Sequence, residues 1–163
     1  KIHTPYIICN DYMYNELKNI KVPTTIMTNS AENNGNIFGA VDYLNHKKDI
    51  INTGVTIKEY EGGISYHGKS MTIDDDIAIV GSFNMDMRSA YIDTELMLVI
   101  NSKDINKQLK ASMEEYEKKA ATVKNETEYS HIPEGMKMKE LSDKKKNIKA
   151  WFGWAMNGLR FLF

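Results

Sequence analysis

The sequence lacks several features that define whole classes of protein. It has one cysteine, Cys9, among 163 residues, which excludes an internal disulfide framework and any metal site built from several cysteines. No apolar run is long enough to cross a bilayer as a helix, and no signal peptide is recognisable. The compositional bias of disordered chains is absent too, because 42% of the residues are hydrophobic. The composition is that of one globular domain with a sizeable core.

Net charge is nearly absent, at −1, but it is distributed unevenly. Residues 137–163 hold seven Lys or Arg against two acidic residues, so this segment carries +5 and the remainder −6. The acidic body counts against nucleic-acid binding, because that affinity rests on neutralising phosphates. A basic segment that also contains apolar residues favours an anionic surface such as a membrane.

The order of apolar patterns predicts an α/β fold, a mixed β-sheet flanked by helices. The first residue is Lys1 and a strand pattern begins at once, so we expect a piece of a longer protein. We divide the chain into a domain of residues 1–123 and a basic linker with a terminal helix, 124–163. The expected strands are 4–9, 24–28, 55–60, 66–73, 77–81 and 94–100, and the expected helices are 11–19, 37–52, 103–123 and 147–163.

The terminal helix is expected to be amphipathic. Its predicted apolar face consists of Ile148, Trp151, Phe152, Ala155, Met156, Leu159, Leu162 and Phe163. Together with the basic residues from Lys144 onward, residues 144–163 suit a membrane interface. Packing of the helix on the protein itself explains the pattern equally, since most amphipathic helices do so.

One group of polar residues carries the chemistry. His67 and Lys69 are two apart on an expected strand, so their side chains share a face. Ser82 and Asn84 follow the next expected strand with the same spacing. If the two strands form a hairpin through the acidic turn at 74–76, the four side chains converge. An imidazole surrounded by an ammonium, a hydroxyl and an amide suits a phosphate group.

Three further features have two interpretations each. The polar run 29–36 is a solvated loop, or its first residues, Asn29 and Ser30, line a substrate cleft. Arg88 pairs with a carboxylate or shapes the pocket. Glu95, on the following strand, is the best candidate to orient the His67 imidazole.

The spacing His67-x-Lys69-x4-Asp74 followed by Gly81-Ser82-x-Asn84 resembles the signature of the phospholipase D superfamily. The longer run 81–95 is similar to the C-terminal catalytic domain of bacterial cardiolipin synthases. Further resemblances to that subgroup lie at residues 4–6, 28–30 and 54–55. The likeness covers residues 4–100 and extends more loosely into the tail.

The resemblance implies a two-step reaction at a site built from two such motifs. One histidine attacks phosphorus and forms a phosphohistidine, and the other, here His67, acts as general acid and then base. Lys69, Ser82 and Asn84 would hold phosphate oxygens, and Glu95 would hydrogen-bond to His67. No metal or other cofactor is implied. Asp74 belongs to the motif, but a turn aspartate that stabilises its own loop explains it as well.

The chain contains one motif where that site needs two. The partner would be the N-terminal half of the same protein or a second copy of this chain, and the isolated chain is expected to be inactive. The leading hypothesis is transfer of a phosphatidyl group between phospholipids at the cytoplasmic face of a bacterial membrane. The alternatives are a phospholipid hydrolase, a dimeric single-motif nuclease and a non-catalytic membrane-binding domain.

Overall fold

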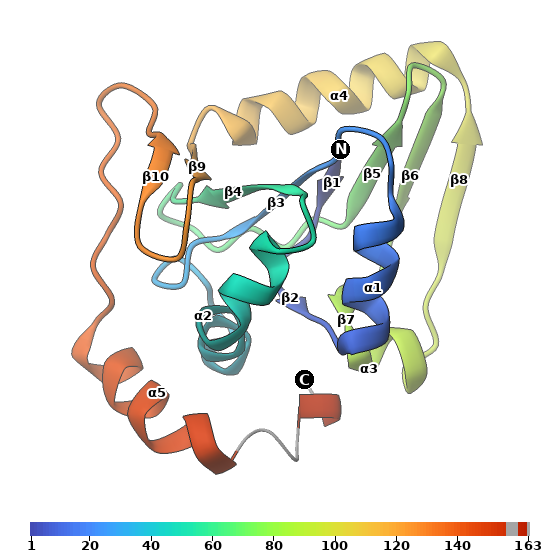
Figure 1. The fold of residues 1–163 in the computed structure, drawn as a ribbon. Coiled ribbons are helices and arrows are strands. Elements are labelled where there is room, and N and C mark those ends of the chain that lie inside the picture. Colours follow the sequence, from blue (N-terminus) through green and yellow to red (C-terminus); the bar gives the residue numbers. More distant parts are fainter. Residues whose placement is uncertain (156–159, 163) are drawn as a thin grey trace.

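The chain folds around one mixed sheet (Figure 1). The computed structural model describes residues 1–155 and 160–162, and within these residues the sheet has eight strands in the order β10-β9-β4-β3-β1-β5-β6-β8. The strands are β1 (Ile2–His3), β3 (Thr25–Asn29), β4 (Thr56–Tyr60), β5 (Ser70–Ile73), β6 (Ile77–Gly81), β8 (Met97–Asn101), β9 (Ala120–Val123) and β10 (Tyr129–His131). Strands β1, β3 and β4 are parallel, and the remaining pairs are antiparallel. The expected α/β class with a mixed sheet flanked by helices is confirmed.

Helices cover both faces of the sheet. The helices are α1 (Asp11–Asn19), α2 (Ile37–Ile51), α3 (Met87–Tyr91), α4 (Lys103–Glu117) and α5 (Asp143–Ala155), with a 3-10 turn η2 (Arg160–Leu162). Neighbouring residues of β4 point to opposite faces, as a strand requires. Lys58 reaches Glu117 of α4 at 2.5 Å, whereas Glu59 accepts a hydrogen bond from Tyr43 of α2 at 2.6 Å. Figure 1 accordingly shows α4 on one side and α2 on the other.

The main core lies between the sheet and helices α1 and α2. A second, two-stranded parallel sheet of β2 (Ile7–Ile8) and β7 (Met85–Asp86) closes the lower part of this layer in Figure 1. The buried side chains include Ile7, Cys9, Ile26, Tyr43, Ile50 and Ile57. Burial raises the pKa of the Cys9 thiol to about 12, so Cys9 is an inert core residue.

Side-chain caps fix where the helices begin. The Asn10 side chain accepts from the Met13 N–H, and Asn36 accepts from two amides at the start of α2. Ser102 caps α4 by accepting from the Ile105 N–H, as the sequence predicts. Gly54 follows α2 with a φ of 86°, a conformation that suits the expected glycine stop.

Several predicted boundaries are wrong. The strand expected from residue 66 begins at Ser70, and the helix expected to reach residue 123 ends at Glu117. Residues 120–123 instead form β9 beside β4, where Ala120 and Ala121 are buried. Part of the expected basic linker, 129–131, is β10, and the Tyr129 hydroxyl bonds to the buried carboxylate of Glu59 at 2.5 Å. The division after residue 123 stays a prediction.

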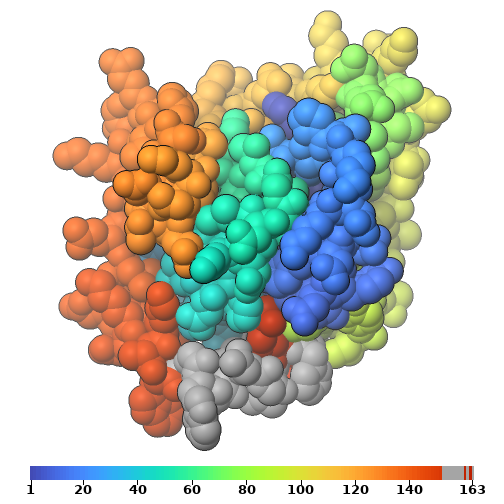
Figure 2. Space-filling model, viewed as in Figure 1, coloured from blue at the N-terminus to red at the C-terminus, as the bar shows by residue number. Residues whose placement is uncertain are grey.

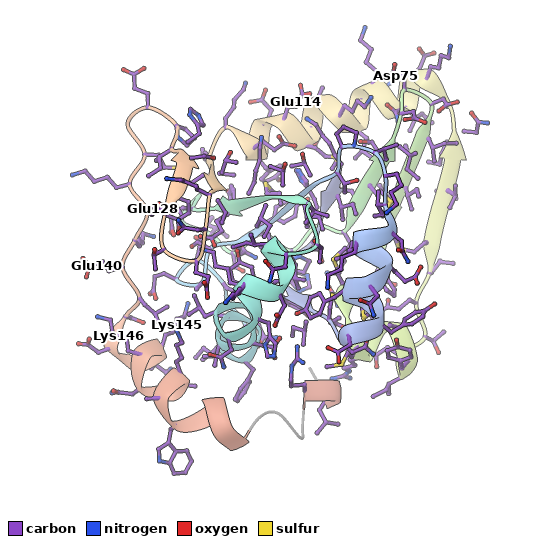
Figure 3. All side chains as sticks on the ribbon, in the orientation of Figure 1. Asp75, Glu114, Glu128, Glu140, Lys145 and Lys146 are labelled. Carbon is purple, nitrogen blue, oxygen red and sulfur yellow. The ribbon has the colours of Figure 1, made fainter. Side chains whose placement is uncertain are left out.

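The described part of the tail packs against the body. The Lys145 side chain is 7% exposed and points inward, whereas Lys146 points away (Figure 3). Arg160 binds Asp42 of α2 at 2.6 Å and the Cys9 carbonyl at 2.8 Å. Figure 2 shows η2 filling the space between α1 and α2.

Trp151 is 81% exposed, while most of the predicted apolar face, from residue 152 onward, lies outside the described side chains. No helix within 1–155 and 160–162 is long and apolar enough to cross a membrane.

Candidate active site

The sheet topology brings four of the motif residues to one edge. Strand β5 runs antiparallel to β1, so its beginning lies beside the carboxyl end of β1. Strand β6 returns to the same edge, and β8 starts there. The start of β5 and the end of β6 therefore lie together, near α3 and β7 in Figure 1. His67 and Lys69 precede β5, and Ser82 and Asn84 follow β6. The carboxyl ends of parallel strands are the usual place for a binding site in α/β proteins.

The His67 imidazole is exposed and held by its neighbour. Lys69 Nζ lies 2.7 Å from His67 Nδ1 and 2.9 Å from the His67 carbonyl oxygen. An ammonium only donates, so Nδ1 accepts and the proton of the neutral ring sits on Nε2. Desolvation, followed by the charge of Lys69, lowers the pKa of His67. These two residues lie in an extended segment before the strand and not on it. They contact each other, while the convergence of all four side chains on a phosphate stays a prediction.

Ser82 is fixed by the beginning of β8. Its amide donates to the Leu96 carbonyl at 3.0 Å, and its hydroxyl accepts from the Leu96 N–H at 3.0 Å. The same hydroxyl donates to the Glu95 carboxylate, and this bond lowers the pKa of Glu95. Within the described residues Glu95 therefore bonds to Ser82, while Lys69 occupies Nδ1 of His67. The expected role of Glu95 as the orienter of His67 has no contact to support it.

Gly81 permits this close approach of β6 and β8. A Cβ atom at this position would lie 2.1 Å from the Leu96 carbonyl oxygen and 2.5 Å from the sulfur of Met97. Both distances are far inside van der Waals contact. The glycine of the motif is therefore required by the backbone that holds Ser82.

Asn84 lies in a compact turn ahead of α3. Its amide N–H and side-chain Nδ2 both donate to the Ser89 hydroxyl, at 3.2 and 3.3 Å. The Ser89 amide in turn donates to Asp86, which caps the helix. The Oδ1 atom of Asn84 is buried and has no partner among the described residues. Arg88 forms two bonds to Asp93, at 3.0 and 3.1 Å, so the predicted carboxylate pairing is confirmed.

One cavity is lined by the His67 side chain, and a second lies beside Asn84. The larger has a volume of about 560 Å³ and is lined by His67 together with Tyr60, Tyr66, Tyr116 and Ile64, among others. Its tyrosine rings pack edge to face, with centroids 4.8 to 6.0 Å apart.

The smaller cavity, about 160 Å³, is polar. Its lining includes Asn84, Asp86, Arg88 and Tyr6. The centroid of the Tyr6 ring lies 6.4 Å from that of the His67 ring. Arg88 thus both pairs with Asp93 and lines a pocket. No sequence pattern predicts either cavity, because the residues that line each of them come from segments far apart in the chain.

The polar run 29–36 is not the solvated loop that we considered. Asn29, Ser30, Asn33 and Asn34 are all buried. Asn29 lies behind the segment that carries His67 and bonds to the backbone of Tyr66 on both sides, at 2.8 Å. The sequence offered a signal in the density of asparagines directly after a strand, but it did not reveal what they bind.

Asp74 and His67 lie at opposite ends of the β5–β6 hairpin. It occupies the turn between β5 and β6 with a φ of 47°. At 3.3 Å per residue, this turn is about 16 Å from Lys69. Lys110 of α4 donates to the Asp74 carbonyl and to the Asp75 side chain, and Figure 3 shows Asp75 at this tip. The geometry gives Asp74 a place in the turn and no contact with the other motif residues.

Solved structures share this fold at low sequence identity. Phosphatidylserine synthase of Haemophilus influenzae Rd KW20 superposes with a TM-score of 0.71 over 99% of this chain and 41% of that chain, at 15% identity. Nuc of Salmonella typhimurium, a phospholipase D family member, gives 0.59 over 75% and 79% of the two chains, at 16% identity. The fold and the His67–Asn84 motif together define a phospholipase D-like domain.

Sequence comparison narrows this class. The profile of the family "Cardiolipin synthase, PLD-like domain" matches residues 1–116, so the chain belongs to that family. Cardiolipin synthase 1 of Staphylococcus epidermidis is 30% identical over 142 residues, which are 85% of this chain and 28% of that protein. Cardiolipin synthase A of Wigglesworthia glossinidia brevipalpis is 35% identical over 42% of this chain and 14% of that protein. The chain thus spans less than a third of the length of these relatives.

Proposed function

We propose that this chain is one catalytic half of a phosphatidyltransferase that acts through a phosphohistidine intermediate. The observation that supports the proposal is the exposed His67 imidazole, which Lys69 holds through Nδ1. Ser82 and Asn84 lie at the same edge of the sheet, directly after β6. With Nδ1 occupied, Nε2 is the atom that meets the substrate. The likeness to cardiolipin synthases supports a phospholipid as that substrate.

His67 serves as acid and then as base. In the first step His67 acts as the imidazolium: the histidine of a second motif attacks phosphorus, the bond to the leaving alcohol breaks, and His67 gives that oxygen the proton on Nε2, which leaves a neutral ring protonated on Nδ1. The contact of Lys69 with Nδ1 belongs to the resting neutral ring and is broken when the ring takes up its second proton. In the second step an acceptor alcohol attacks phosphorus, the phosphorus–nitrogen bond breaks, and His67 takes the acceptor proton. The ammonium of Lys69 and the amide of Asn84 stabilise the charged phosphoryl oxygens. Ser82, fixed by Glu95, supplies a further polar contact.

The second motif comes from the N-terminal half of the same protein or from a second copy. An apolar rim beside the half-site supports such a contact. Leu96 is 79% exposed immediately after Glu95, and Tyr91, Ile92 and Leu98 are also exposed. The chain covers less than a third of the length of its relatives, which favours the N-terminal half of the same protein as the source. Either way, a monomer of residues 1–163 is inactive.

We further propose that the protein is associated with the cytoplasmic face of a bacterial membrane. Lys144, Lys146, Lys149 and Trp151 are exposed on α5, while Lys145 faces inward. An exposed row of cations beside an aromatic ring suits an anionic lipid surface. Flotation with phosphatidylglycerol vesicles tests this. Replacing the three exposed lysines with glutamine should reduce the floating fraction, and unchanged flotation contradicts it.

The test of the catalytic proposal uses the full-length protein. Incubation with phosphatidylglycerol, with and without phosphatidylethanolamine, followed by identification of the lipid products, separates transfer from hydrolysis. Transfer gives a lipid with two phosphatidyl groups, whereas phosphatidic acid alone favours the hydrolase. A tight dimer of 1–163 with turnover would favour a single-motif enzyme, including the nuclease alternative, against which the acidic body argues.

A further inference from the structure

The buried carboxamide of Asn29 has all of its hydrogen-bonding capacity used. Its Nδ2 donates to the carbonyls of Pro5 and Tyr66, both at 2.8 Å. Its Oδ1 accepts from the Tyr66 amide at 2.8 Å and from Asn33 Nδ2 at 3.1 Å. A side-chain amide has two donor hydrogens and two acceptor lone pairs, so no position is left over. Asn29 is 1% exposed, its bonds to Pro5 and Asn33 are buried, and its bonds to Tyr66 are partly buried.

These bonds reach both segments that flank the His67 ring. Tyr66 directly precedes His67, and Asn29 holds its backbone on both the N–H and the carbonyl side. Pro5 directly precedes Tyr6, whose ring stands 6.4 Å from that of His67. One side chain thus fixes the backbone from which the imidazole extends and the backbone of its aromatic neighbour.

Asn33 forms a second layer of the same kind. Its Nδ2 also donates to the Ile64 carbonyl at 3.1 Å, and its Oδ1 accepts from the Gly63 amide at 3.0 Å. The Gly35 amide donates to the Ser65 hydroxyl at 3.0 Å. The loop after β3 therefore binds each of residues 63–66, the segment that leads to His67.

Lys145 of the tail holds this loop from the other side. Its ammonium donates to the carbonyls of Ala31, Glu32 and Asn34, at 2.8, 2.5 and 3.0 Å. Three carbonyls around one ammonium satisfy all of its hydrogens. Lys145 lies 78 positions after His67 in the sequence, and within the described residues its ammonium bonds to the loop that contains Asn33 and follows Asn29.

We propose that Asn29, braced from the C-terminal helix by Lys145, is the positioning residue of the half-site and sets the orientation of His67. The assignment rests on the proposed role of His67. Neither residue touches the reacting atoms. Because the chain of contacts is continuous from α5 to the imidazole, the tail contributes to the geometry of the site as well as to any membrane contact.

The first test uses the chain of residues 1–163 and Lys145→Met, which removes the ammonium and keeps the length of the side chain. Lys144→Met and Lys146→Met are matched controls, because these neighbours are exposed. Amide hydrogen exchange of residues 63–66 should be about tenfold faster in Lys145→Met, as expected when a local hydrogen-bonded unit loses charged bonds. Exchange in β1 and β3 should not change, and both controls should match the parent chain. Unchanged exchange at 63–66, or a uniform increase throughout the sheet, overturns the proposal.

The second test uses the full-length protein. Lys145→Met and Asn29→Asp should lower kcat for product formation about tenfold and leave KM for the lipid unchanged, since a misplaced acid and base affects the chemical step. A rise in KM alone overturns the assignment. If the parent protein forms no lipid product, the proposed function fails, but the exchange experiment still decides whether Asn29 and Lys145 hold the His67 segment.

Discussion

The two ends of the β5–β6 hairpin carry parts of one sequence motif but have different surroundings. At one end His67, Lys69 and Ser82 place polar groups at the surface beside the half-buried Asn84, and bonds from the buried Asn29 hold the backbone behind His67. At the other end Asp74 lies in an exposed turn that bonds to Lys110 of α4 and to the Ser102 amide. The comparison shows that a fixed spacing in sequence records two separate requirements, one for chemistry and one for forming the hairpin.

The largest expected effect separates the two ends directly. His67→Ala in the full-length protein should lower the rate of product formation roughly 10³-fold or more, because general acid and base catalysis is lost. Quantification of the lipid product measures this. Asp74→Asn is the control from the other end of the hairpin and should stay within about threefold of the parent, since a surface substitution without special contacts has little effect. Equal losses in both variants would show that the two ends do not differ.

The second prediction concerns the glycine that brings β6 to β8. Gly81→Ala should destabilise the chain by about 1–3 kcal/mol, because its Cβ would overlap the Leu96 carbonyl and overpacking has this magnitude. Denaturant unfolding of residues 1–163 measures the loss. Ala90→Gly, at an exposed position in α3, is the comparison variant: it changes the freedom of the backbone between alanine and glycine without any steric overlap. Unfolding of Gly81→Ala at the parent midpoint would contradict the close approach of the two strands.

The third prediction concerns the pKa of His67. Desolvation and the charge of Lys69 hold this pKa below 6.5. Lys69→Met removes a positive neighbour that disfavours the imidazolium, so the pKa should rise toward 6.5. NMR titration of the His67 ring in residues 1–163 measures it. Glu95→Gln should shift the pKa less, because the described partner of Glu95 is Ser82; a larger shift in Glu95→Gln would restore Glu95 as the orienter.

The sequence was sufficient for the parts of the molecule that local patterns determine. The hairpin at 70–81 and the Ser102 cap follow from strand period and turn chemistry. His67 and Lys69 were expected to be neighbours from their spacing, and they are, although they precede the strand. It failed where distant segments decide the outcome. Residues 120–123 have no strong strand pattern of their own and become β9 because β4 offers an open edge.

The same limit applies to the site. Glu95 was the candidate to orient His67 because it lies on the following expected strand, whereas in the structure Lys69 bonds to the ring nitrogen and Glu95 bonds to Ser82. Asn29 and Lys145 could not be linked from the sequence, since their connection passes through backbone carbonyls of a loop whose fold no pattern specifies. A side chain that bonds to a backbone carbonyl can have any residue type as its partner, so the sequence does not show which residues are paired.

The smallest expected effect is at the hairpin tip. Asp74 has a φ of 47°, a region that glycine adopts without a steric penalty. Lys110 binds the backbone carbonyl of Asp74, which a substitution retains. Asp74→Gly should therefore change the free energy of unfolding by less than about 1 kcal/mol, because the relief of strain offsets the greater freedom of the unfolded chain. Asp74→Val, which is β-branched, should be less stable than Asp74→Gly. Denaturant midpoints of the two variants give the order, and a severe loss in Asp74→Gly would mean that the carboxylate has a partner outside residues 1–163.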